Sequence, residues 1–125
     1  MENIRVSVQG ARISHISLVH REVSVGIVFR IFNASDRALT LNGIYFKVFN
    51  EKGEEIADGK LEGKSALNPH SSHYVISEVK MPVVWFFAKS LLDLRDRGAS
   101  TLNIKGKLEI DGSPVKFETV WKIGD

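Results

Sequence analysis

The sequence contains no cysteine and only three prolines among its 125 residues. The absence of cysteine excludes disulfides, thiolate nucleophiles and cysteine-ligated zinc, and it leaves the redox compartment open. No apolar run approaches the roughly 20 residues that a transmembrane helix needs, and the first residues lack the basic and apolar regions of a signal peptide. We therefore expect a cytoplasmic protein without a membrane anchor.

The charge balance is nearly even, with 17 Lys and Arg residues against 15 Asp and Glu residues and a net charge of +2. Apolar residues make up 43% of the chain. This suffices for a core, because a chain of this length buries about two thirds of its unfolded surface on folding. Glycine and proline are scattered as single turn residues, so no linker divides the sequence. We expect one folded domain over residues 1–125.

Alternation of apolar and polar residues is the main pattern of the chain. In Val23–Phe32 every odd position is apolar, which is typical of a strand with one face on a core. Val28 and Phe32 add apolar side chains to the even face, which predicts a central strand. Further strands are predicted at Ile4–Leu18, Leu39–Phe49, Ile56–Ala57 and His73–Val79. A turn is predicted at Asn50–Gly53, and a bulge or bend at Asp58–Gly59.

The clearest hairpin joins Leu102–Ile110 to Val115–Ile123, with Asp111–Pro114 as its turn. Placing Ile110 opposite Val115 brings opposite charges together on the outer face, where each such pair contributes about 0.2–1 kcal/mol. The predicted pairs are Leu108–Phe117, Ile104–Trp121, Glu109–Lys116 and Lys107–Glu118. Short strands separated by turns predict a sandwich or a barrel.

Only the segment Pro82–Arg97 departs from alternation. Proline at a first helical position and Gly98 just beyond the last one favour a helix, inserted before the final hairpin. One apolar side of this helix is expected to pack on a sheet. Trp85 and Leu92 lie away from that side. Together with Phe86 they are either covered by another segment or form an exposed apolar patch for a partner.

No group of residues predicts catalysis. His70 and His73 have a spacing that two metal ligands could use, but a metal needs further ligands and cysteine is absent. We expect an ordinary surface role for both histidines. The sequence also lacks a Gly-x-Ser-x-Gly elbow, a P-loop and a Gly-x-Gly-x-x-Gly motif. We therefore expect a protein that is not an enzyme and has no cofactor and no metal site.

An acidic cluster falls in the expected strand–turn–strand segment and consists of Glu51, Glu54, Glu55 and Asp58. A calcium loop of the EF-hand kind needs oxygen ligands alternating over about 12 residues between two helices. The expected structure here is a hairpin instead. The cluster therefore predicts a solvated turn rather than a cation site.

Four lysines lie on the outer face of the predicted final hairpin, namely Lys105, Lys107, Lys116 and Lys122. The same face carries Glu109 and Glu118, and the predicted cross-strand pairs account for these charges. Phe117 and Trp121 fall on the inward face, so the exposed aromatic rings on which single-stranded nucleic acid stacks are missing. The sequence therefore predicts no nucleic-acid partner.

Several segments carry a family pattern over nearly the whole chain. They are Val23–Phe32, Asn33–Ser35, Leu41–Phe49 with Tyr45, Gly53, Ile56–Gly59, the expected helix and the closing hairpin. Taken together they resemble the WHy (water stress and hypersensitive response) domain, which is shared with the folded group 2 of late-embryogenesis-abundant (LEA) proteins. The Asn-Pro-Asn of that family matches here at Asn33 only, because Ala34 and Ser35 replace its Pro and second Asn.

The resemblance implies an immunoglobulin- or fibronectin III-like β-sandwich of about seven antiparallel strands with one α-helix before the C-terminal hairpin. It marks Asn33 and Gly59 as structural positions, with Asn33 capping the loop after its strand. It further implies a non-enzymatic role in protection against desiccation or temperature stress, through non-covalent contacts with protein clients or surfaces. The alternative is a protein–protein interaction module that uses the apolar helix patch. The client and the oligomeric state stay open.

Overall fold

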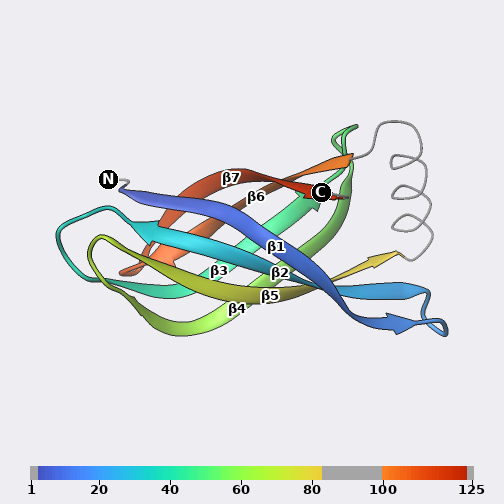
Figure 1. The fold of residues 1–125 in the computed structure, drawn as a ribbon, viewed down its shortest axis with the longest axis horizontal. Coiled ribbons are helices and arrows are strands. Elements are labelled where there is room, and N and C mark those ends of the chain that lie inside the picture. Colours follow the sequence, from blue (N-terminus) through green and yellow to red (C-terminus); the bar gives the residue numbers. More distant parts are fainter. Residues whose placement is uncertain (1–2, 83–99, 124–125) are drawn as a thin grey trace.

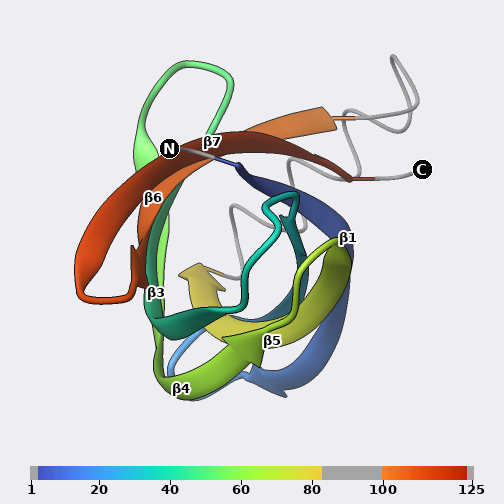
Figure 2. The same ribbon diagram turned by 90° about the vertical axis from the view of Figure 1, so that its left-hand side faces the viewer.

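The computed structural model describes residues 3–82 and 100–123, and these residues form two antiparallel sheets. The strands are β1 (Ile4–Ser17), β2 (Glu22–Asn33), β3 (Leu39–Phe49), β4 (Glu55–Leu67), β5 (Ser71–Pro82), β6 (Ser100–Ile110) and β7 (Ser113–Ile123). The three-stranded sheet has the order β1-β2-β5, and the four-stranded sheet has the order β4-β3-β6-β7. Figure 1 shows the strands along the long axis of the molecule, and Figure 2 shows the two layers curving around a common core.

The edges of the two sheets lie close to each other. β4 lies beside β5 and β1 lies beside β7. At the first of these seams the Ser77 hydroxyl donates a hydrogen bond to the carbonyl oxygen of Lys60 at 3.5 Å. The outer surface therefore continues from the four-stranded sheet across this seam onto β5.

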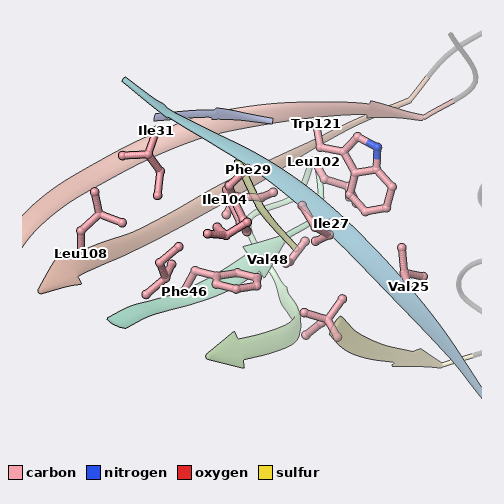
Figure 3. Close-up of a cluster of buried hydrophobic side chains, with 14 of the residues drawn as sticks. Val25, Ile27, Phe29, Ile31, Phe46, Val48, Leu102, Ile104, Leu108 and Trp121 are labelled. Carbon is pink, nitrogen blue, oxygen red and sulfur yellow. The ribbon is translucent and has the colours of Figure 1, made fainter. Parts of the chain in front are cut away.

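The centre of the core comes from β2, which pairs with β1 on one side and β5 on the other. The prediction of a central strand is confirmed. All its apolar odd residues are buried, because each points at the four-stranded sheet. The fully buried Phe29 ring meets the rings of Phe46 and Phe117 edge-on, with centroid distances of 5.0 Å and 6.1 Å. Figure 3 shows Phe29 of β2 and Phe46 of β3 together with Ile104 and Leu108 of β6 between the sheets.

The predicted fold class was wrong in its inserted helix. Residues 3–82 and 100–123 contain strands and turns only, and Pro82, expected as the first helical residue, is the last residue of β5. Proline is tolerated there because β5 is an edge strand that needs no further hydrogen-bond donor at its end. Residues 83–97 of the expected helix lie outside the described residues. The β-sandwich itself agrees with the prediction.

The predicted register of the final hairpin was wrong by two residues. Ile110 lies opposite Ser113, and the turn consists of Asp111 and Gly112 alone, with φ angles of 51° and 83°. Asp-Gly with two positive φ angles is the two-residue hairpin turn whose twist matches that of the strands. Because side chains alternate with a period of two, this shift keeps the apolar face inward but changes every cross-strand partner.

The predicted bulge at Asp58–Gly59 was also wrong. These residues lie inside the long strand β4 and pair regularly with Lys47 and Phe46 of β3. The register between β3 and β4 shifts elsewhere, between Val48 and Phe49 and between Leu41 and Gly43. Gly59 is required because the Phe46 ring covers its inner side. A Cβ built on Gly59 would lie 2.5 Å from Phe46 Cζ and 2.8 Å from Val79 Cγ1.

Candidate functional site

The neighbours of His70 and His73 indicate an ordinary structural role for both residues. His70 is exposed, and its Nε2 lies 2.7 Å from Oδ1 of Asp36 in the turn after β2. His73 lies on β5 opposite Ile31. In residues 3–82 and 100–123, no group of three or more histidine, aspartate and glutamate side chains is placed to hold a metal ion.

The acidic cluster lies in and after the turn between β3 and β4. Asn50 organises this turn, since its Oδ1 accepts hydrogen bonds from the backbone N–H groups of Lys52 and Glu54, both at 2.9 Å. Its Nδ2 donates to Glu54 Oε1 at 2.8 Å. Glu55 forms an ion pair with Lys47 at 3.5 Å. The predicted turn at Asn50–Gly53 is confirmed.

Asn33 is fully buried at the end of β2. Its Nδ2 donates hydrogen bonds to the carbonyl oxygens of Arg37 at 2.9 Å and Leu67 at 3.0 Å, and its Oδ1 accepts from the backbone N–H of Ser35 at 2.9 Å. The next residue, Ala34, donates its backbone N–H to the carbonyl oxygen of Asn3 at 2.7 Å. A proline at position 34, as in the family motif, could not make this bond.

The expected partner patch of Trp85, Phe86 and Leu92 lies outside the described residues. Another apolar surface is present at the tip of the β1–β2 hairpin, at one end of the molecule (Figure 1). Leu18 and Val19 in the turn are 80% and 88% exposed, and Ile13 and Ile16 on β1 are also exposed. We call these four residues the hairpin tip. The sequence signal for it was a pair of adjacent apolar residues, Leu18 at the end of a predicted strand and Val19 just after it.

A second surface lies on the outer face of the four-stranded sheet. The register places Tyr45 of β3 between Lys60 of β4 and Lys107 of β6, and Lys107 directly opposite Lys116 of β7. One step along β3, Lys47 lies directly opposite Lys105. We define the lysine face as the five lysines with the two rings on the same side of β3: Lys47, Lys60, Lys105, Lys107, Lys116, Tyr45 and Phe49.

The lysines of this face are only partly paired with carboxylates. Lys107 Nζ lies 3.8 Å from Glu109 Oε2. The two side chains are 52% and 27% exposed, and an ion pair in contact with solvent contributes little to stability. Within the described part of the chain, Lys60, Lys105 and Lys116 form no ion pair. The ammonium groups of Lys105 and Lys107 lie over the rings of Phe49 and Tyr45, at 5.6 Å and 5.7 Å from the ring centroids.

The lysine face is hollowed. A depression of about 890 Å³ is lined by side chains of β3, β4, β6 and β7 and extends across the seam to Glu78 and Lys80 of β5. Its lining includes six lysines and only two carboxylates, those of Asp58 and Glu78. Glu78 already accepts a hydrogen bond from the Ser14 hydroxyl at 2.6 Å. The depression is therefore more basic than the protein as a whole, whose net charge is +2.

Tyr45 contributes a neutral hydroxyl to this face. Desolvation, followed by the charges of Glu62 and Glu109, raises the pKa of Tyr45 above its ordinary value of 10.0. The hydroxyl also lies 3.5 Å from Glu62 Oε2, to which it donates. At neutral pH the ring therefore adds no negative charge beside the lysines.

The lysine face is not evident from the sequence, because its members come from separate segments. Lys47 and Lys60 lie on β3 and β4, which the sequence did not place beside the final hairpin. The two-residue error in register also paired Lys107 and Lys116 with glutamates. The Asp-Gly turn was the available signal, because it fixes the register that sets Lys107 against Lys116.

No model of a known protein family matches this sequence, and no curated protein matches it. Solved structures do share its fold. The solution structure of AT1g01470 from Arabidopsis thaliana aligns with a TM-score of 0.69 and 17% identity, covering 96% of this chain and 80% of that one. The X-ray structure of the structural genomics target SoR45 aligns with a TM-score of 0.58 and 11% identity, covering 99% and 88%.

A crystal structure of a protein from Archaeoglobus fulgidus aligns with a TM-score of 0.53 and 10% identity, covering 94% of this chain and 97% of that one. At such identities the likeness concerns the fold alone, a small β domain. The described residues include no helix of the length and apolar character needed to cross a lipid bilayer.

Proposed function

We propose that this chain is a non-enzymatic protective domain of the WHy type, which holds partly unfolded client proteins by non-covalent contact during desiccation or temperature stress. The observation that carries the proposal is the hairpin tip, with Leu18 and Val19 80% and 88% exposed. The family resemblance of the sequence supports the stress setting. The cytoplasmic location expected from the sequence is part of the same proposal.

The physical basis is the burial of apolar surface. A client that begins to unfold exposes apolar segments, and burying one aliphatic side chain against them contributes about 1.5–3 kcal/mol. The side chains of Leu18 and Val19 add little to this protein's own core, since they extend into solvent. They are therefore available for contact, and the neighbouring residues His20 and Arg21 keep the turn hydrated.

An aggregation assay tests this function. An unrelated enzyme is heated or dried alone, with this protein, or with an inert protein of similar size and charge, and light scattering and recovered activity are measured. We expect suppression by this protein and loss of that suppression in a Leu18→Ser/Val19→Ser variant. Ile76→Ser, at a 54% exposed position on β5, is the matched control and should protect like the wild type. Protection no better than that of the inert protein would exclude the proposed function.

A further inference from the structure

One like-charge pair on the lysine face destabilises the sheet, and the fold itself does not explain it. Lys107 lies directly opposite Lys116. In the neighbouring row Lys47 lies opposite Lys105, but Asp58 lies on the other side of Lys47 and Glu118 on the other side of Lys105. Like charges directly across a ladder destabilise a sheet. A bound anion removes this repulsion, because it places negative charge between the ammonium groups. The arrangement therefore points to an anionic ligand.

The two rings narrow the class of anion. Tyr45 and Phe49 are half-buried on this face and have lysine ammonium groups over them. Surfaces that bind single-stranded nucleic acid combine a basic groove for the backbone with aromatic side chains on which bases stack. The carboxylates of an acidic peptide and the phosphate of a lipid headgroup bring no aromatic ring to stack on Tyr45 and Phe49. The rings thus favour a polymer that carries both phosphates and bases.

The shape of the lysine face favours a flexible polymer over a membrane as its ligand. The depression of about 890 Å³ runs across four strands of one sheet and onto β5. A bilayer is flat on this scale and would meet the rim of the depression before its floor. A flexible single strand can follow the depression and place successive phosphates near successive lysines.

We propose that the lysine face binds single-stranded nucleic acid, with phosphates held by Lys60, Lys107 and Lys116 in one row and by Lys47 and Lys105 in the next, and with bases stacked on Tyr45 and Phe49. The sequence argued against such a partner on two grounds, namely balanced charges across the final hairpin and the lack of exposed rings beside the lysines. The structure changes both. Across the hairpin Lys107 faces Lys116 instead of a glutamate, whereas Lys105 does face Glu118. The rings of Tyr45 and Phe49, rather than those of Phe117 and Trp121, lie among the lysines. The proposal does not depend on the protective function, which uses the hairpin tip.

Fluorescence anisotropy with a labelled oligothymidylate tests this site over a series of salt concentrations. We expect binding that weakens with salt, with a slope of log K against log [salt] of about −0.7 per neutralised phosphate. Lys107→Glu/Lys116→Glu should weaken binding and make the slope shallower by about 0.7 for each lysine–phosphate contact that is lost. Arg5→Glu/Arg12→Glu, on exposed positions of β1, is the matched control. It changes the net charge equally and should bind like the wild type.

The rings are tested separately with Phe49→Leu, which keeps an apolar side chain without a π-system. We expect an affinity about fivefold lower, the low end of base–aromatic stacking, with an unchanged salt slope. Circular dichroism and thermal unfolding establish that each variant is folded. Three results would overturn the proposal: no binding at low salt, an equal loss in the β1 control, or binding to polyglutamate or phosphatidylserine vesicles with none to the oligonucleotide.

Discussion

The side chain of Asn33 joins the two sheets, because its Nδ2 donates a hydrogen bond to the carbonyl oxygen of Leu67 at 3.0 Å. Asn33 ends β2 of the three-stranded sheet, whereas Leu67 ends β4 of the four-stranded sheet. Both residues are buried, so this carbonyl has no access to water as a substitute partner. One amide therefore fixes the ends of two strands that are distant in the sequence.

Removal of this amide should destabilise the fold. In Asn33→Ala the buried carbonyl oxygen of Leu67 loses its donor, and a buried polar group left without a partner costs about 1–3 kcal/mol. The exposed carbonyl of Arg37 keeps a hydrogen bond from the Ser35 hydroxyl. Asn33→Asp should be comparably unstable, since it keeps the acceptor for Ser35 but places an oxygen where the donor was. Urea unfolding measures both variants. Asn68→Ala, at an exposed position, is the control, and an equal effect there would contradict the assignment.

The glycine at position 59 should not tolerate a side chain. Gly59→Ala places a Cβ 2.5 Å from Phe46 Cζ, and overpacking of this kind costs about 1–3 kcal/mol. Gly10→Ala is the matched control, because a Cβ there meets nothing within 4 Å. The second change Phe46→Leu should restore part of the stability of Gly59→Ala. If the two alanine variants unfold at the same denaturant concentration, the close approach of the Phe46 ring is not what requires glycine.

A charge reversal on the lysine face should stabilise the fold. Lys116→Glu replaces a like-charge pair with an opposite-charge pair across from Lys107, and we expect a gain of about 0.2–1 kcal/mol. The exposed Lys64 supplies the control, since Lys64→Glu alters net charge by the same amount. Thermal unfolding at low ionic strength measures the effect, and added salt should diminish it. A loss of stability in Lys116→Glu would show that the repulsion is already relieved.

Tyr45 should titrate at higher pH than free tyrosine. Its pKa is raised by desolvation and by Glu62 and Glu109, so its midpoint should lie above 10.0. Ultraviolet absorbance of tyrosinate measures this in a Tyr74→Phe variant, where Tyr45 is the remaining tyrosine. Glu62→Gln should lower the midpoint.

The sign of the accompanying stability effect follows from the raised pKa. The folded state holds the Tyr45 proton more tightly than the unfolded state does, so the contribution is complete below the pKa of about 10 in the unfolded chain. It is lost as the pH rises through the folded value. Unfolding measured over this range should show stability falling with pH, and falling less in Tyr45→Phe. A Tyr45 midpoint at or below 10.0 would contradict the influence of the two carboxylates.

Alternation was sufficient to place most strand faces. In β3, Ile44, Phe46 and Val48 are buried, whereas the residues between them face outward, as the pattern predicts. The long strand β4 was harder to identify, because Gly59 was interpreted as a bulge. The reason for that glycine is the ring of a residue on another strand, which no local pattern contains.

By itself, the sequence determined a β domain with inward and outward faces, since a period of two in hydrophobicity permits one buried side of a strand. It did not determine which residues face each other, because a shift of two residues leaves that pattern unchanged. The tertiary structure decided this through the Asp111–Gly112 turn, where the backbone N–H and Oδ1 of Asp111 both bond to the Thr40 backbone at 2.9 Å. That register, with the pairing of β3 between β4 and β6, gathers lysines from four strands around Tyr45.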